Sequence, residues 1–178
     1  MNTPLICTFI GKDKPGLVSS LAASIKQHQG NWLESSMAQL AGYFAGIVRI
    51  DVNANNRDAL IQSLHALDAE GLRVRIADDS STHNQSRQPI SHGHHKLQIV
   101  GNDRPGIVHE ITQALSSNAI NVLEMATHLS SAAMSGDPLF NATMLLAVPP
   151  ATDLDLLSSQ LDAIATALAI EIDLIDDQ

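Results

Sequence analysis

A duplicated segment constrains the fold of this chain more than any other feature of its sequence. The segment 11–18, with the sequence GKDKPGLV, recurs ninety residues later at 101–108 as GNDRPGIV, and five of the eight positions are identical. The same offset aligns three residues of the first copy with three of the second: Asn31, Leu33 and Glu34 with Asn121, Leu123 and Glu124. Because the register holds for twenty-four residues, the chain is interpreted as two copies of one module.

The first half of each copy predicts a strand, a turn and a helix. Short apolar runs at 5–10 and 97–100 end at a glycine, as strands commonly do. The proline in the next turn suits the first turn of a helix. Apolar residues then recur on one helical face in both copies: Leu17, Val18, Leu21 and Ile25, and Ile107, Val108, Ile111 and Leu115. Gly30-Asn31 and the segment 118–121 are expected to end these helices.

The second half of each copy predicts a hairpin, a helix and a last strand. Ala41-Gly42 is expected to join strands at 31–40 and 43–52, and the matching loop at 130–138 is about six residues longer. The second helices carry Leu60, Leu64 and Leu67, and Leu157, Leu161 and Ile164, before alternating strands at 72–76 and 170–174. This β-α-β-β-α-β order predicts an α+β fold of two ferredoxin-like domains, each an antiparallel sheet with both helices on one face.

A polar segment separates the two copies. We expect one domain at 1–79, a histidine-rich linker at 80–94 and a second domain at 95–178. The histidines of this tract are His83, His92, His94 and His95. No cysteine or acidic cluster lies beside them, so a solvated or pH-responsive linker is favoured over a metal site. No metal and no cofactor are expected.

Charge and missing motifs narrow the function classes. The net charge of −9 comes entirely from residues 91–178, residues 1–90 are neutral, and aromatic residues make up only 3%. Neither half offers the clustered basic face or the stacking platforms of a nucleic-acid-binding protein. No apolar run is long enough for a membrane span, and no signal peptide is recognised, so a cytoplasmic protein is expected. The common catalytic motifs are absent, and the single cysteine, Cys7, is expected to be a buried thiol, which predicts a protein that is not an enzyme.

With these motifs in the same order twice, each copy resembles the ACT domain, a regulatory module that binds small molecules. Two such domains in about 180 residues resemble the glycine cleavage system transcriptional repressor family. The resemblance implies a regulator that responds to glycine or another small amino acid and acts through a protein partner, such as a DNA-binding transcription factor. The alternative is a detached regulatory subunit that controls an enzyme of an amino-acid pathway. A homodimer is compatible with either.

The resemblance also implies a ligand site at the loop after the first strand and at the start of the second strand. The matching residues are Gly11, Asp13, Gly16 and Asn31 in the first copy, and Gly101, Asp103, Gly106 and Asn121 in the second. Well-known serine-binding members carry an amide at the loop position, where this chain has a carboxylate.

The chemistry of these residues also supports a ligand site at this loop. A helix N-terminus can hold a carboxylate, an aspartate beside it can take an ammonium group, and an asparagine offers both a donor and an acceptor. These groups together suit a zwitterion. The structural alternative remains open at this point: Asp13 and Asp103 could cap their helices, and the asparagines could satisfy local backbone groups.

Overall fold

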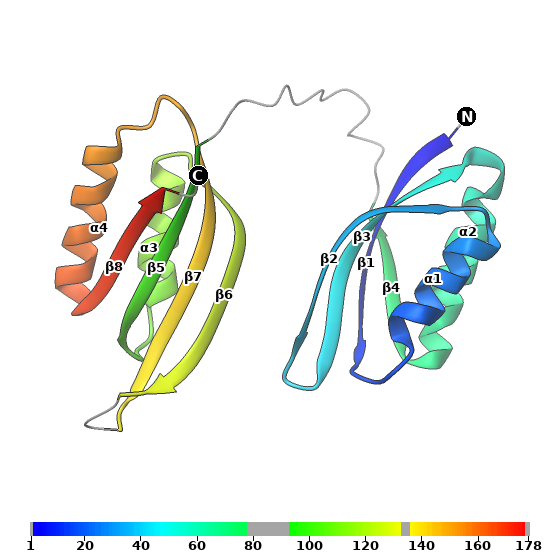
Figure 1. Ribbon diagram of the computed structural model, residues 1–178, viewed down its shortest axis with the longest axis horizontal. Helices are drawn as coiled ribbons and strands as arrows, with labels where there is room; N and C mark the ends of the chain where they lie inside the picture. Colours follow the sequence, from blue (N-terminus) through cyan, green and yellow to red (C-terminus); the bar gives the residue numbers. More distant parts are fainter. Residues whose placement is uncertain (1, 78–92, 133–135, 177–178) are drawn as a thin grey trace. The chain divides into compact units, whose positions relative to one another are not determined.

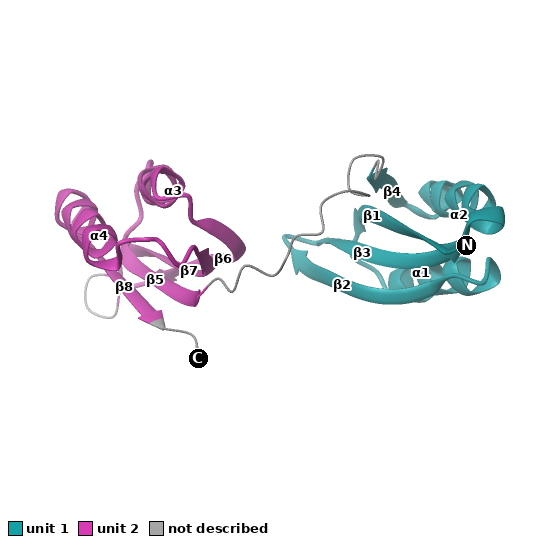
Figure 2. Ribbon diagram, turned by 90° about the horizontal axis from the view of Figure 1, so that it is seen from above, with its two compact units in different colours: residues 1–86 teal, residues 87–178 magenta. Residues whose placement is uncertain are grey.

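The computed structural model describes residues 2–77, 93–132 and 136–176, and the chain forms two compact units, residues 1–86 and 87–178 (Figures 1 and 2). Residues 80–92 of the expected linker, with His83 and His92, lie outside the described residues. The strand that opens the second unit begins at Gly93, so His94 and His95 lie in a strand rather than in a linker, and His95 is buried.

The first unit has the predicted order of elements. These are β1 (Asn2–Lys12), α1 (Leu17–Gln27), β2 (Asn31–Leu40), β3 (Tyr43–Asn53), α2 (Ala54–Ala66), a 3-10 turn η1 (Leu67–Glu70) and β4 (Leu72–Ala77). The strands form an antiparallel sheet of order β2-β3-β1-β4, called sheet A here. Figure 1 shows α1 and α2 on the same face of this sheet.

The second unit repeats this arrangement. Its elements are β5 (Gly93–Asn102), α3 (Ile107–Ser117), β6 (Asn121–Ser131), β7 (Pro138–Val148), α4 (Leu154–Leu168) and β8 (Ile170–Asp176). The antiparallel order β6-β7-β5-β8, called sheet B, matches sheet A strand for strand. The predicted α+β class with two ferredoxin-like domains is therefore confirmed.

Helix ends differ in one detail from the sequence expectation. The left-handed residues after α1 and α3 are Gln29 (φ 59°) and Ala119 (φ 56°), rather than the glycine at position 30. The next N–H groups donate back into the helix, from Gly30 to Ile25 O at 2.9 Å and from Ile120 to Leu115 O at 3.0 Å.

Each unit has its own hydrophobic core between its sheet and its two helices. In the first unit the inward residues of β1 and β3 pack with apolar residues of α1 and α2, among them Leu5, Val48, Leu21 and Leu64. The second unit buries a separate set: Leu97, Met144, Ile111 and Leu157 are fully buried within it. None of the described helices is long and apolar enough to cross a membrane.

Candidate functional site

The repeated loop between the first strand and the first helix lies at the same place in both units. The Asp13 N–H donates to Gly42 O at 2.9 Å, and the Asp103 N–H donates to Pro138 O at 3.0 Å. Gly42 lies in the turn between β2 and β3, and Pro138 is the first residue of β7, so in each unit the backbone holds the loop against that hairpin.

The fold explains two glycines in each copy of the repeated segment. Gly16 and Gly106 precede their helices with φ of 97° and 103°, a region that side chains rarely enter. A Cβ on Gly11 would lie 2.5 Å from Gly71 O, and a Cβ on Gly101 would collide with Ile170. Gly16 and Gly106 are thus also favoured by the backbone path, and Gly11 and Gly101 by close contact at the start of the last strand.

The basic residue of the loop also has a structural partner. Lys14 Nζ donates to Glu70 O at 2.6 Å, at the end of η1. In the second unit Arg104 Nη2 donates to Ala167 O at 3.2 Å, near the end of α4. The shared positive charge therefore satisfies a carbonyl at a helical C-terminus, where cations are favoured.

Unlike Lys14 and Arg104, the side chains of Asp13 and Asp103 have no partner among the described residues. Both residues are exposed, and neither side chain makes a hydrogen bond or ion pair with the described part of the chain. The capping interpretation is wrong, because the N-cap residues are Gly16 and Gly106 and no side chain caps α1 or α3. The first backbone N–H groups of a helix have no partner within it, and in both units an uncapped helix begins four residues after the aspartate.

Asn31 and Asn121 lie away from this loop in their own units. Asn31 pairs with Asp51 of β3, while Gly11 pairs with Phe44, seven residues away along the same strand. The second unit has the same separation, from Ala147 to Phe140. Seven residues of strand span about 23 Å. One unit therefore brings together the loop residues, but it does not bring the asparagine to them.

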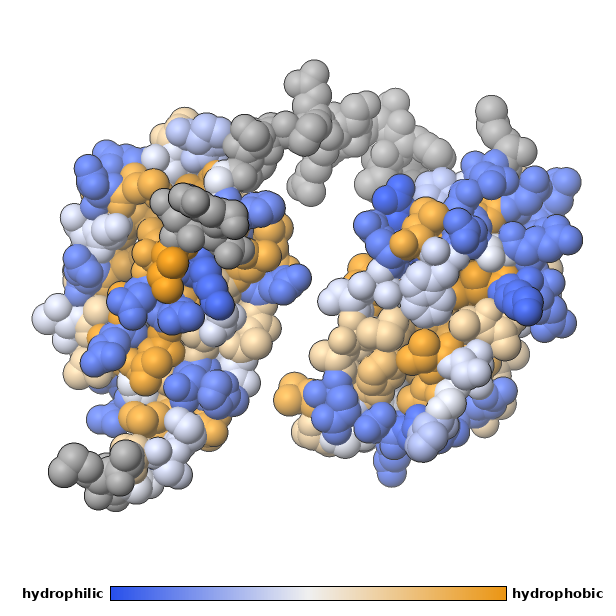
Figure 3. Space-filling view, viewed as in Figure 1, coloured by the Kyte–Doolittle hydropathy of each residue, from blue (hydrophilic) through white to orange (hydrophobic). Residues whose placement is uncertain are grey.

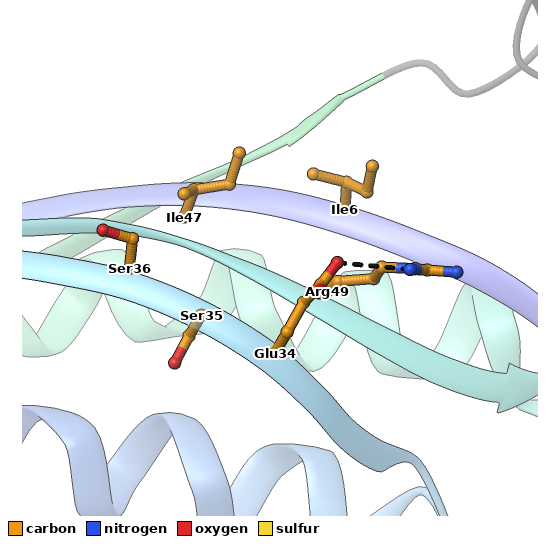
Figure 4. A pocket seen from close by; sticks show the side chains of 6 residues that line it. All are labelled: Ile6, Glu34, Ser35, Ser36, Ile47 and Arg49. Carbon is orange, nitrogen blue, oxygen red and sulfur yellow. Dashed lines mark hydrogen bonds and ion pairs between the residues drawn. The ribbon is translucent and has the colours of Figure 1, made fainter. Parts of the chain in front are cut away.

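A hollow on the helix-free face of sheet A is a second candidate (Figure 4). It has a volume of about 300 Å³ and is lined by Ile6, Glu34, Ser35, Ser36, Ile47 and Arg49. The Arg49 Nη1 donates to Glu34 Oε1 at 3.2 Å, and the two side chains are 49% and 69% exposed. A charge pair of this exposure contributes little to stability, and its two charges are available to an outside partner.

This ion pair is confined to the first unit among the residues that the structure describes. The residue that pairs with Glu124 in sheet B is Leu145, where sheet A has Arg49 opposite Glu34. The recurrence of the glutamate was visible in the sequence as the alignment of Glu34 with Glu124. The partnership with Arg49 could not be found there, because it depends on the register between β2 and β3. Within the described residues, no group of three or more His, Cys, Asp or Glu side chains could hold a metal ion.

Comparison with known proteins gives a family for the first unit and a fold for the whole chain. Residues 3–76 match the family model of the ACT domain. No curated protein matches the chain. A protein of unknown function from Galdieria sulphuraria is 25% identical, with a TM-score of 0.79 and 100% of both chains covered. The crystal structure of a proposed glycine cleavage system transcriptional repressor is 20% identical, with a TM-score of 0.72 and 99% of both chains covered.

The match at 3–76 spans β1 to β4 and includes the loop at Asp13. The second unit has the same order of strands and α-helices, the same strand order in its sheet and the same loop motif as the first unit. Residues 3–76 therefore match the ACT domain, and residues 93–176 form a second domain of the same fold.

Proposed function

We propose that this chain is a non-enzymatic, amino-acid-responsive regulator in the cytoplasm that controls transcription of the glycine cleavage system through a protein partner. The observation that carries the proposal is the loop carboxylate. In both units the described fold gives a partner to the basic residue that follows the aspartate, Lys14 or Arg104, but gives none to the aspartate itself. A residue repeated without a structural role is a candidate for ligand binding.

The ligand class follows from the chemistry at this loop. The carboxylate of Asp13 or Asp103 would accept hydrogen bonds from an ammonium group, and the uncapped helix start beside it would hold a carboxylate. Glycine and other small amino acids carry both groups at short separation. Asn31 and Asn121 would not contribute to the site at the loop of their own unit, because each lies at the far end of its own sheet.

Regulation of transcription through a protein partner is supported by two observations. The proposed glycine cleavage repressor shares the fold over 99% of both chains. The strongly acidic second half of the chain disfavours direct contact with DNA, which makes a DNA-binding protein the expected partner. A bound amino acid would act by favouring one arrangement of the complex over another.

The ligand part of the proposal is tested by a thermal-shift screen with the twenty amino acids, followed by titration calorimetry. A true binder raises the melting temperature of the chain by mass action. The shift should be lost in the double variant Asp13→Ala/Asp103→Ala. Since neither carboxylate has a partner in the fold, this variant should unfold at the same temperature as the unmodified protein when no ligand is present.

The matched control is Asp58→Ala/Asp155→Ala, which removes two exposed carboxylates from α2 and α4. This control should keep the ligand-dependent shift. An unmodified chain that shows neither heat nor shift with any amino acid would sink the sensing part of the proposal. The partner is tested separately by affinity capture, where recovery of a metabolic enzyme in place of a transcription factor would favour a detached regulatory subunit.

A further inference from the structure

Each sheet has one face that its helices leave uncovered, called the open face here. On sheet A this face carries Ile6, Thr8 and Ile10 of β1 and Ala45 and Ile47 of β3, which alternate with the buried residues. Ile10 and Ile47 are 47% and 46% exposed. The solvated face of an antiparallel sheet is normally polar, so apolar residues at its centre indicate a partner. Figure 3 shows apolar side chains interrupted by hydrophilic ones on the surface of each unit.

The edge strands β4 and β8 place opposite charges at equivalent positions of the two open faces. Arg73 and Arg75 pair with Ile10 and Thr8 in sheet A. Their counterparts in sheet B are Glu171 and Asp173, which pair with Val100 and Gln98. Val100 and Gln98 are the residues of the second copy that align with Ile10 and Thr8 of the first. The strand partners of these residues therefore occupy equivalent positions, with Arg73 equivalent to Glu171 and Arg75 equivalent to Asp173.

These charges are available to a partner. All four side chains are exposed, and Arg75, Glu171 and Asp173 make no hydrogen bond or ion pair with the described residues. Arg73 Nε lies 3.9 Å from Asp68 Oδ1, and both side chains are 68% exposed, so this contact is weak.

The excess charge of each whole open face has the same sign as its edge strand. Sheet A presents four basic and two acidic side chains, which are Lys12, Arg49, Arg73 and Arg75, and Glu34 and Asp51. Glu34 pairs with Arg49 and Asp51 accepts a hydrogen bond from Asn2, and the four basic and two acidic side chains leave an excess of two positive charges. Sheet B presents one basic and three acidic side chains, which are Lys96, and Glu124, Glu171 and Asp173.

The shapes of the two open faces are also compatible with docking. A hollow of about 260 Å³ lies between the two arginines and the centre of sheet A, lined by residues that include Thr8, Ile10 and Ala45. On sheet B the exposed apolar residues Val100 and Ile175 flank the acids. An apolar side chain can therefore seat in the hollow while the charges pair at its rim, which is the usual anatomy of an interface.

We propose that the open face of sheet A docks on the open face of sheet B of a second copy of this chain. Pairing of two A faces or two B faces would oppose like charges, so complementarity selects the mixed contact. In a twofold dimer the mixed contact forms twice.

The area that a dimer would bury supports a second copy of the chain as the partner of the open faces. A face of four strands and about seven residues has an area of roughly 400 Å², so one face-to-face contact buries about 800 Å² in total. Stable interfaces bury about 1,200–2,000 Å². Two contacts in one dimer reach about 1,600 Å², within this range.

The test uses charge reversal in the full chain, with sedimentation velocity as the readout. The unmodified protein should dimerise, and its Kd should rise with ionic strength. Arg73→Glu/Arg75→Glu alone and Glu171→Lys/Asp173→Lys alone should each raise the Kd about 100-fold or more. An equimolar mixture of these two variants should form a heterodimer, because one of its contacts then pairs the two reversed faces and the other pairs two unmodified faces, so both contacts join opposite charges.

Matched controls carry the same change of charge on the helices. Lys26→Glu/Arg57→Glu corresponds to the arginine variant, and Asp155→Lys/Asp162→Lys corresponds to the acidic one. Both controls should dimerise like the unmodified chain, and circular dichroism should show every variant folded. A chain that stays monomeric at the highest attainable concentration overturns the proposal. A dimer that survives both reversals, or two monomeric variants that fail to associate when mixed, overturns it as well.

Discussion

Two positions of the repeated segment favour glycine for different physical reasons. Around Gly16 and Gly106 there is open space, with no atom within 4 Å of an added Cβ, so only the positive φ disfavours a side chain. At Gly11 the φ is ordinary, but an added Cβ would meet the backbone oxygen of Gly71. A backbone constraint and a contact constraint thus lie five residues apart in one loop.

We therefore expect Gly16→Ala to destabilise the first unit by about 1–2 kcal/mol, the usual cost of forcing a side chain into the left-handed region. Gly16→Asn should cost less, because asparagine tolerates positive φ better than alanine does. Urea unfolding of both variants measures the difference. Equal stability of the alanine variant and the unmodified chain would show that the loop does not hold this φ in solution.

Cys7 should be chemically inert in the folded chain. The residue is fully buried in β1, and burial raises the pKa of its thiol to about 11. Since the thiolate is the reactive form, alkylation at pH 8 should be about 100-fold slower or more in the native protein than in the unfolded chain. A native rate that matches the rate in denaturant would contradict the buried position.

The same raised pKa makes stability depend on pH in the alkaline range. The folded chain retains the thiol proton above the pH at which the unfolded chain, with a pKa of 9.0, releases it. The stabilising contribution is therefore fully present below pH 9 and is lost as the pH rises toward 11. Over this interval the unmodified chain should lose more free energy of unfolding than Cys7→Val, because valine does not titrate.

At the scale of elements, one long basic side chain in each unit connects the loop before the first helix to the end of the second helical segment. Lys14→Ala removes the bond to Glu70 O, and Arg104→Ala removes the bond to Ala167 O. Each change should lower the free energy of unfolding by about 0.5–1.5 kcal/mol. Lys12→Ala, which makes no such bond, should have a smaller effect in the same denaturant titration. A Lys12 effect equal to that of Lys14 would show that charge alone matters at this loop.

At the scale of the whole molecule, two separate cores predict two separately destabilised units. Leu64 and Leu161 hold equivalent buried positions in α2 and α4. Leu64→Ala should cost about 2–5 kcal/mol and should reduce hydrogen-exchange protection within 2–77, whereas Leu161→Ala should do so within 93–176. The measurement belongs at low protein concentration, where the docking proposed above is not populated. Equal loss of protection in both units from one substitution would contradict separate cores.

The sequence alone determined the elements and their order. The apolar faces of α1 and α3, the turn at Ala41-Gly42 and the duplication itself are local patterns, and local patterns follow from the geometry of the chain. They were sufficient for the fold class, because only a few topologies accommodate this order of strands and helices. The repeat also identified the loop at Asp13, although it could not separate capping from an exposed carboxylate.

Only the tertiary structure decided which side chains lie together. The distance of Asn31 from Asp13, the contact of Lys14 with Glu70 and the pairing of Glu34 with Arg49 all join segments that are remote in the sequence. The alignment of Arg73 and Glu171 on equivalent edges likewise depends on strand register. Register is set by hydrogen bonds between strands and by the burial of one face, and a shift of one residue would move every side chain to the other face.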